Sequence, residues 1–209
     1  MKKTILVLAA LTITTYVFGQ GQINFNTRVT SSSLGTVNAP IYGPDVNDPS
    51  SSWEGATPPG GYVGTTIAGT GFTAELWGGP AGSAEGALVL VGTTTFRTNT
   101  SGIFAGHVQS LAAAPTVPGV PGGSLATFQL RVYDNVGGTI TEWAGVGPTT
   151  ASGKSSLFSP AYPLGGGVVF PPNLEGLTSF NLSIVPEPSA IALGVLGLGA
   201  LVLFRRRKN

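Results

Sequence analysis

The chain has 209 residues with a formal net charge of +1, and only 9% of the residues are charged. It contains no cysteine, which excludes disulfide bonds, thiol catalysis and cysteine-based zinc sites. Its 32 glycines and 16 prolines, together with a hydrophobic content of 42%, favour short strands joined by turns in one globular body.

The first residues have the organisation of a secretory signal. Lys2 and Lys3 form a basic start, and an apolar stretch follows from Thr4 to Val17. Val17 and Gly19 occupy the third and first positions before a possible cleavage site after Gly19, where signal peptides carry small or tolerated residues. We therefore predict a signal peptide over residues 1–19. An N-terminal membrane anchor is the alternative, but the stretch is short and no stop-transfer charges follow it.

The first half of the body contains several short alternating segments. Residues 22–29 alternate apolar and polar side chains, which predicts a half-buried strand. Residues 31–61 are rich in serine, proline, glycine and aspartate, and we predict a long loop there. A strand is predicted over residues 72–77, and residues 88–97 and 103–108 are predicted to pair as a hairpin.

The second half continues in the same way after a connection rich in proline and glycine at residues 112–123. Residues 127–133 form the clearest strand, and residues 139–143 are predicted as its return strand after a turn. The last predicted strand covers residues 178–184, with Phe180, Leu182 and Ile184 pointing inward.

No segment of the body has helical periodicity over more than two turns. We therefore predict an all-β fold, an antiparallel β-sandwich or jelly-roll-like single domain over residues 20–184. From Gln20 to Val185 there are four cationic side chains and eight carboxylates, a net charge of −4. This acidic balance argues against nucleic acid and against peripheral binding to anionic lipid.

The C-terminal segment, residues 185–209, has three parts. The triplet Pro186-Glu187-Pro188 comes first, and an apolar run extends from Ala190 to Phe204. A helix over this run would be roughly 24 Å long, slightly less than the ~30 Å hydrocarbon core, so we predict a transmembrane helix. The basic stop that follows holds this end in the cytoplasm by the positive-inside rule; it consists of Arg205, Arg206, Arg207 and Lys208. An ordinary C-terminal membrane anchor is the alternative.

A Pro-Glu-Pro triplet followed by an apolar helix and a basic end resembles the PEP-CTERM sorting signal. Bacteria with this signal are thought to process it with exosortase, a membrane-embedded protease-transpeptidase, in organisms that make extracellular polysaccharide. The resemblance implies that Pro186, Glu187 and Pro188 are recognition residues and that the chain is a substrate. It also implies an exported protein, held first in the inner membrane, that reaches the cell surface or extracellular matrix and is associated with exopolysaccharide.

The residues that could carry catalysis are few. His107 is the only histidine, and no serine stands in a Gly-x-Ser-x-Gly turn, so we predict a structural or surface role for it. Paired glutamates could hydrolyse glycosides, but the glutamates of the body are scattered and we predict that they are solvated: Glu54, Glu75, Glu85, Glu142 and Glu175. We predict a non-enzymatic protein without a cofactor; a cryptic hydrolase is the weaker alternative.

Two further features admit a binding role. Asp45, Asn47 and Asp48 offer oxygen atoms of the kind that calcium prefers, but they are also ordinary turn residues, and we predict no metal site. Trp77 lies on the polar face of its predicted strand and could stack on a sugar ring, as could Trp53 or Trp143. A carbohydrate-binding module is thus the alternative function, against packing of these rings under a loop.

Overall fold

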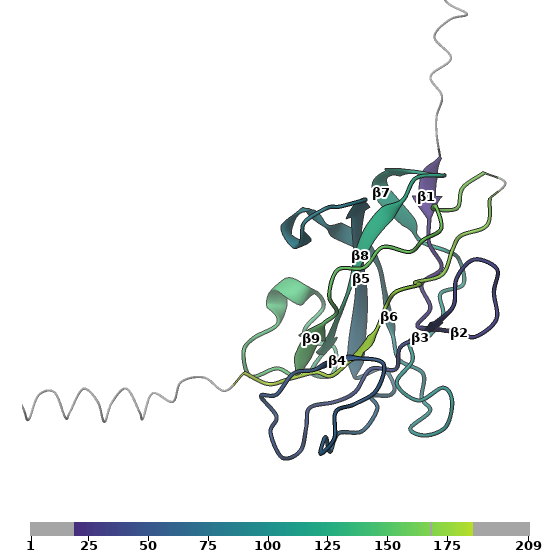
Figure 1. Cartoon of the computed structure of the whole chain (residues 1–209). Coiled ribbons are helices and arrows are strands. Elements are labelled where there is room, and N and C mark those ends of the chain that lie inside the picture. The colour runs from purple at the N-terminus through teal and green to yellow at the C-terminus, as the bar shows by residue number, and fades with distance from the viewer. Residues whose placement is uncertain (1–18, 168, 186–209) are drawn as a thin grey trace, which may run out of the picture.

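The computed structural model describes residues 19–167 and 169–185. The fold is all-β and antiparallel, as predicted from the sequence (Figure 1). Its main sheet has four strands in the order β6-β5-β8-β9. Their bounds are β5 Phe72–Pro80, β6 Val89–Thr95, β8 Ala126–Asp134 and β9 Ser152–Lys154.

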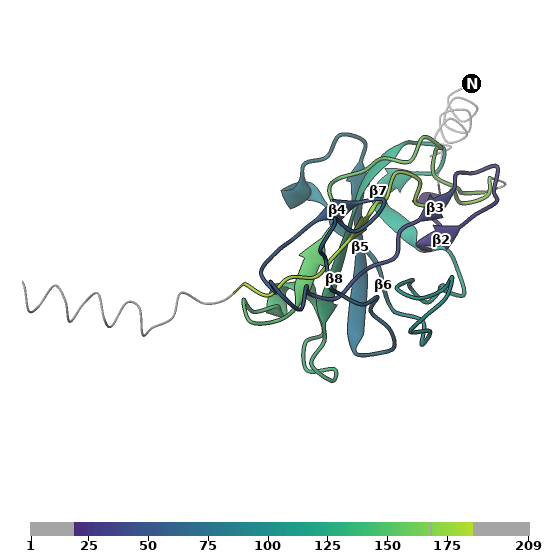
Figure 2. The ribbon, with the colours of Figure 1, turned by 60° about the horizontal axis from the view of Figure 1, so that its bottom comes forward.

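Three two-stranded ladders and their connecting loops complete the body. They pair β1 (Gln20–Gln22) with β7 (Thr116–Pro121), β2 (Arg28–Val29) with β3 (Val37–Asn38), and β4 (Glu54–Gly55) with β10 (Ser179–Phe180). Two 3-10 turns, η1 (Glu85–Ala87) and η2 (Trp143–Gly145), lie in the loops. The chain enters the body at β1 and leaves it near β9, at two separate places (Figures 1 and 2).

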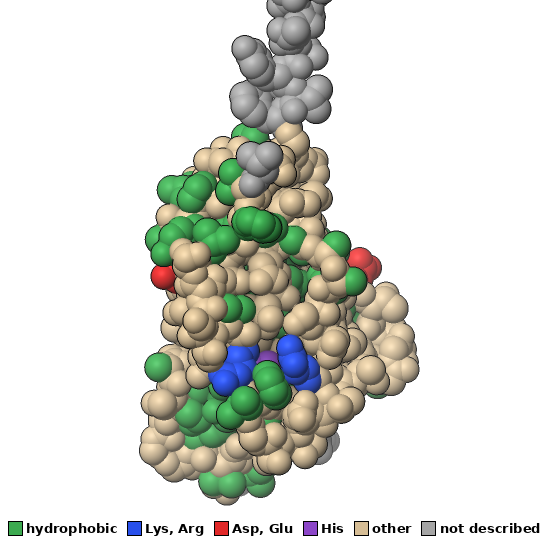
Figure 3. All heavy atoms as spheres, turned by 90° about the vertical axis from the view of Figure 1, so that its right-hand side faces the viewer, with side chains coloured by type: hydrophobic (Ala, Val, Ile, Leu, Met, Phe, Trp, Pro, Cys, Tyr) green, Lys and Arg blue, Asp and Glu red, His purple; other side chains and the backbone are tan. Residues whose placement is uncertain are grey.

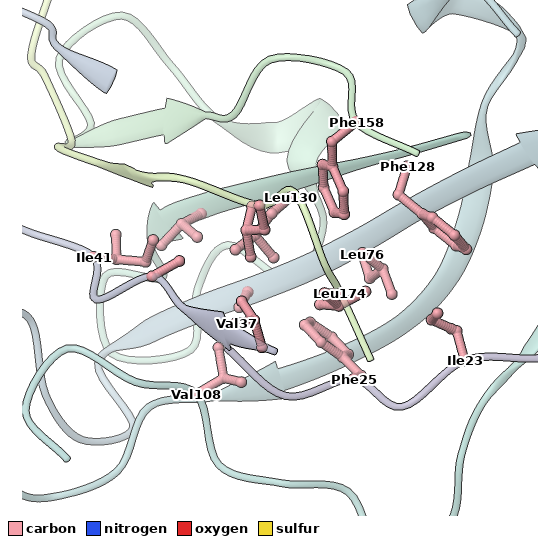
Figure 4. Packing of buried hydrophobic residues seen from close by; sticks show 14 of the residues in the cluster. Ile23, Phe25, Val37, Ile41, Leu76, Val108, Phe128, Leu130, Phe158 and Leu174 are labelled. Atoms are coloured by element: carbon pink, nitrogen blue, oxygen red, sulfur yellow. The ribbon is translucent and has the colours of Figure 1, made fainter. Parts of the chain in front are cut away.

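The core lies between the main sheet and the N-terminal segment that runs through β2 and β3. Figure 4 shows Ile23, Phe25 and Val37 of this segment packed toward Leu76 of β5 and Leu130 of β8. All five side chains are buried. The alternation predicted for residues 22–29 is therefore present in the burial pattern, even though the segment pairs only in short ladders and isolated bridges. Hydrophobic burial determines which side chains of the segment point inward, and the loops limit how many of its residues pair with a neighbouring strand.

A glycine in β5 makes room for the largest side chain on the inner face of β8. Gly78 lies directly opposite Phe128 in the register of these strands. A Cβ atom on Gly78 would lie 2.7 Å from the ring of Phe128. Only glycine leaves the space for this ring to lie over the sheet.

The opposite face of β8 is also covered. The side chains of β8 that point away from Phe128, Leu130 and Val132 are also buried: Thr127, Gln129, Arg131 and Tyr133. Turn η2 contacts β8 and covers part of this face. A strand buried on both faces in this way has polar side chains that need partners within the protein.

Two predicted strands are replaced by turns. Residues 139–143 do not return along β8; they lead into η2, and β9 is the antiparallel neighbour of β8 instead. Residues 103–106 form a turn, and the hairpin is reduced to the pairing around Phe96 and Val108. Strand β6 pairs with β5 on its other edge. The positive φ angles of Gly102 (78°) and Gly106 (75°) bend the chain where a continuous strand was predicted.

Other differences concern the ends of strands. The connection at residues 112–123 contains β7, because Pro118 and Pro121 are tolerated in a short strand that pairs only with β1. The last predicted strand forms a ladder only at Ser179–Phe180, and Ile184 is partly exposed while Phe180 and Leu182 are buried. The predicted loop 31–61 includes β3 and β4.

Within residues 19–167 and 169–185, no helix has the length and apolar character needed to cross a membrane. The predicted signal peptide, apart from Gly19, and the predicted transmembrane helix lie outside the described residues.

Candidate functional site

A groove of about 450 Å³ lies between β4, β9, β10 and η2. Trp53 and Trp143 both line it, and both are partly exposed. Its other lining residues are mainly polar: Ser52, Glu54, Ser152, Gly153, Lys154, Phe180, Asn181 and Ser183. The groove thus combines two large aromatic rings with hydroxyl and amide groups, which is the chemistry that suits a neutral sugar.

Trp53 is held in place by neighbouring aromatic rings and by Asn181. Its ring centroid lies 5.4 Å from that of Tyr42 and 5.6 Å from that of Tyr62. Its backbone N–H donates to Oδ1 of Asn181 at 2.8 Å, and the Asn181 amide donates to the carbonyl of Ser51 at 3.0 Å. The indole Nε1 is buried and has no hydrogen-bond partner among the described residues. The ring is therefore fixed, and its one polar atom is unsatisfied.

The charged residues of the groove are engaged by the protein itself. Both oxygens of Glu54 accept hydrogen bonds from the backbone N–H of Ser156, at 3.0 and 2.9 Å, and one accepts from Oγ1 of Thr178 at 2.7 Å. Lys154 forms an ion pair with Glu85 at 2.7 Å. This pair lowers the pKa of Glu85 below its usual range. Neither charge is free to act as a general acid or base without breaking these contacts.

Glu75 corrects one of the predictions from the sequence. It was expected to be a solvated surface charge, but it is 1% exposed. Its carboxylate accepts three hydrogen bonds, from Nε1 of Trp77 at 2.8 Å, from the hydroxyl of Tyr133 at 3.0 Å and from the backbone N–H of Trp143 at 2.9 Å. A carboxylate with this many donors can be buried. Burial, and next the charge of Glu75, raise the pKa of Tyr133.

Trp77 belongs to this network and does not line the groove. Its indole N–H is used by Glu75, and the guanidinium of Arg131 lies over its ring, 4.1 Å from the centroid. Arg131 also approaches the ring of Trp143 at 5.7 Å and Glu85 at 3.7 Å. One face of Trp77 is thereby occupied, whereas Trp53 and Trp143 both contribute to the groove.

The body remains hydrogen-bonded up to the residue before the Pro-Glu-Pro triplet. The N–H of Ile184 donates to the carbonyl of Pro49 at 2.7 Å, and that of Val185 donates to the carbonyl of Pro148 at 3.0 Å. The side chain of Val185 is 60% exposed. The predicted recognition residues and basic stop follow directly and lie outside the described residues: Pro186, Glu187, Pro188, Arg205, Arg206, Arg207 and Lys208.

The sequence pattern of the PEP-CTERM protein-sorting motif matches residues 185–208. The chain carries a PEP-CTERM sorting signal. No curated protein matches the chain, and no solved structure does so either. The PEP-CTERM motif implies export, sorting to the envelope and processing by exosortase, a membrane protein. The match begins at Val185, whose backbone N–H is hydrogen-bonded to the body.

His107 lies in the loop after β6 and is buried, with 2% of its surface exposed. Its Nδ1 lies 3.1 Å from Oγ1 of Thr27, and the same oxygen accepts from the N–H of Val108 at 3.2 Å. The Thr27 hydroxyl can therefore donate to Nδ1 of a neutral imidazole. Burial, and next the charge of Arg28, lower the pKa of His107 to about 4. Of the structural or surface role predicted from the sequence, the surface position is excluded by this burial.

The two aspartates of the predicted calcium alternative form turns. Oδ1 of Asp45 accepts from the N–H of Asn47 at 2.8 Å, and Oδ1 of Asp48 accepts from the N–H of Ser50 at 3.1 Å. Hydrogen bonds from Ser50 lower the pKa of Asp48. Within the part of the chain that the structure describes, no three His, Cys, Asp or Glu residues are grouped to hold a metal ion.

Proposed function

We propose that this protein is a non-enzymatic component of the cell surface or extracellular matrix, delivered by its PEP-CTERM signal and associated with exopolysaccharide. The observation that carries the proposal is the motif at residues 185–208, immediately after a body whose backbone is hydrogen-bonded through Val185. Such an arrangement presents a folded β domain directly at the point where the signal is processed. The engagement of Glu54 and Glu75 as hydrogen-bond acceptors supports a role other than hydrolysis.

The motif makes a direct prediction about maturation. Replacing Glu187 with alanine removes the only acidic side chain of residues 185–209, and we expect the variant to accumulate in the inner membrane with its C-terminus intact. The measurement is mass spectrometry of the mature C-terminus in native cells, together with fractionation of membrane and matrix. Glu142→Ala, which alters an exposed carboxylate of the body, is the matched control. Normal processing and delivery of the Glu187→Ala variant would contradict the proposal.

The groove supports a second candidate function, binding of neutral carbohydrate. The specific observation is the pair Trp53 and Trp143 in one groove with hydroxyl and amide groups. Packing the apolar face of a sugar on such a ring contributes roughly 1–2 kcal/mol for about 50–80 Å² of apolar surface buried, at about 25 cal/mol per Å².

If the groove binds sugar, Trp143→Ala should weaken retention in affinity gels containing neutral polysaccharides about tenfold, since 1.4 kcal/mol corresponds to a factor of ten. Phe170→Ala is the matched control, because Phe170 is an aromatic residue that is 78% exposed and does not line the groove. Equal retention of Trp143→Ala and Phe170→Ala would remove this candidate, and a loss in Trp77→Ala alone would place the site at the ring of Trp77.

A further inference from the structure

The four cationic side chains of the body fall into two pairs with different surroundings. Arg131 and Lys154 both form ion pairs with Glu85, at 3.7 and 2.7 Å. Arg28 and Arg97 have no carboxylate within 4.0 Å among the described residues. A body with a net charge of −4 thus leaves two guanidinium groups without a counter-ion.

These two unpaired arginines share one aromatic ring. The guanidinium carbon of Arg97 lies 4.8 Å from the ring centroid of Phe104, and that of Arg28 lies 5.6 Å from it. Figure 3 shows this face, with basic side chains on both sides of hydrophobic atoms and acidic side chains well away from them. We call Arg28, Arg97 and Phe104 the arginine clamp.

The apolar part of this surface is open to solvent. Phe104 is 38% exposed, and its neighbour Ile103 is 65% exposed. Both residues belong to the turn that replaces the predicted strand, between Gly102 and Gly106. The result is a small apolar surface flanked by two positive charges.

The surrounding backbone and side chains hold the clamp in position. Nη1 of Arg28 donates to Oδ1 of Asn38 in β3 at 3.1 Å. Nε of Arg97 donates to the carbonyl of Val108 at 3.3 Å, and its Nη2 donates to Oγ of Ser110 at 3.2 Å. The N–H of Ile41 donates to the carbonyl of Gly106 at 2.8 Å and ties the turn to the core. Each guanidinium keeps further N–H donors for a ligand, and the fixed side chains reduce the entropy lost on binding.

The charges of Arg28 and Arg97 also act together on a buried side chain. Arg28 and Arg97 both contribute to the lowered pKa of the buried His107, after the larger effect of burial. Because their positive potentials overlap at this point, an anion at the surface would experience both charges.

We propose that the arginine clamp binds a carboxylate-bearing sugar unit of an acidic polysaccharide. A guanidinium group matches a carboxylate with two parallel hydrogen bonds, and the apolar face of a pyranose ring can pack on Phe104 and Ile103. Two cations on an otherwise acidic body suit a ligand with spaced carboxylates better than a dense row of phosphates. The inference rests on the proposed association with exopolysaccharide and specifies which chemical group is recognised.

The test uses the full chain in a neutral detergent and polygalacturonate as the probe, with binding measured by calorimetry. We expect the double variant Arg28→Gln/Arg97→Gln to bind at least tenfold more weakly, and Arg28→Lys/Arg97→Lys to retain part of the affinity because it keeps both charges. Phe104→Leu keeps an apolar side chain without the aromatic ring and should lose affinity several-fold. Glu142→Gln, a change of one exposed charge elsewhere, should bind as the unchanged protein does, and near-ultraviolet circular dichroism checks that each variant is folded.

Three comparisons identify the ligand. The fully methyl-esterified polymer, which lacks the charge, and polyglutamate, which lacks the sugar ring, should each bind at least tenfold more weakly than polygalacturonate. Equal binding of either polymer, undiminished binding by the folded double glutamine variant, or preference for vesicles of anionic lipid would overturn the assignment.

Fractionation of cells separates this inference from the function on which it rests. If the protein co-fractionates with exopolysaccharide but the purified chain does not bind polygalacturonate, the clamp assignment is wrong and the proposed association stands. If the purified chain binds but the protein is absent from the polysaccharide fraction in cells, the clamp assignment stands and the proposed association is wrong.

Discussion

Val136 has a backbone conformation that its side chain disfavours. Its φ angle is 50°, in the left-handed region, and it is 54% exposed in the turn after β8. The N–H of Val136 donates to Oδ1 of Asp134 at 2.8 Å, which holds the turn in this form. A β-branched residue costs roughly 1 kcal/mol in this region, whereas asparagine adopts it more readily.

Val136→Asn should therefore raise the free energy of unfolding by about 1 kcal/mol. Urea unfolding followed by tryptophan fluorescence measures the change. Val46→Asn is the matched control, because Val46 is 72% exposed and has no positive φ angle; it should change stability by less than about 0.5 kcal/mol. If the free energy of unfolding rises no more in Val136→Asn than in this control, the backbone at Val136 is not strained.

His107 gives the folded protein a defined sensitivity to acid. Its pKa falls from 6.5 to about 4 on folding, mainly because of burial. Below the unfolded value the unfolded chain binds a proton that the folded chain does not, so stability is complete above about pH 6.5 and falls as the pH decreases toward 4. The loss is about 1.4 kcal/mol per pH unit, or about 3 kcal/mol in all.

His107→Asn should remove this part of the acid sensitivity, since asparagine does not titrate and can accept from the Thr27 hydroxyl. The free energy of unfolding, measured between pH 7 and pH 4, should fall by about 3 kcal/mol less in the variant than in the unchanged protein. The carboxylates are common to both proteins, so the difference isolates the imidazole. Parallel profiles would mean that His107 titrates normally in the folded state.

At the scale of the elements, Glu75 joins β5, β8 and η2. It stands opposite Arg131 in the register of the two strands and accepts from Tyr133 of β8 and from the first residue of η2. The turn at residues 139–143 is thus tied to the sheet by a buried carboxylate instead of by strand pairing. This network also explains why the polar face of β8 is buried.

Glu75→Ala should lower the free energy of unfolding by about 3 kcal/mol, because it leaves three donors without their acceptor beside the buried Arg131. Denaturant unfolding followed by the fluorescence of Trp77 and Trp143 provides the measurement. Glu142→Ala removes an exposed carboxylate near η2 and should have an effect below about 0.5 kcal/mol. Equal effects of the two substitutions would show that the network contributes little.

At the scale of the whole molecule, the two termini of the described chain leave the body at different places, at β1 and near β9 (Figure 1). Ser152 and Ser183 line the groove of Trp53 and Trp143, and the same two residues form a β-bridge with each other shortly before the sorting signal. The arginine clamp is formed by Arg28 at β2 and by the turn after β6. The groove of Trp53 and Trp143 and the arginine clamp are therefore two independent candidate surfaces with separate variants to test them.

The sequence by itself determined the sorting signal and the all-β class. A sorting signal is read as a linear segment, so residues 185–208 needed no fold to be recognised. Alternation of apolar residues also predicted β5, β8 and the inward side chains Phe180 and Leu182, because hydrophobic burial selects one face of a strand wherever it pairs.

Only the tertiary structure decided which polar residues are buried and which meet. Glu75 and Trp77 have the spacing of an exposed face, and no local pattern reveals the turn that covers them. Arg28 and Arg97 are far apart in sequence and meet only at Phe104, in a turn that the sequence predicted as a strand. Strand pairing and loop closure are long-range contacts, so the surfaces that they create do not exist in any single segment.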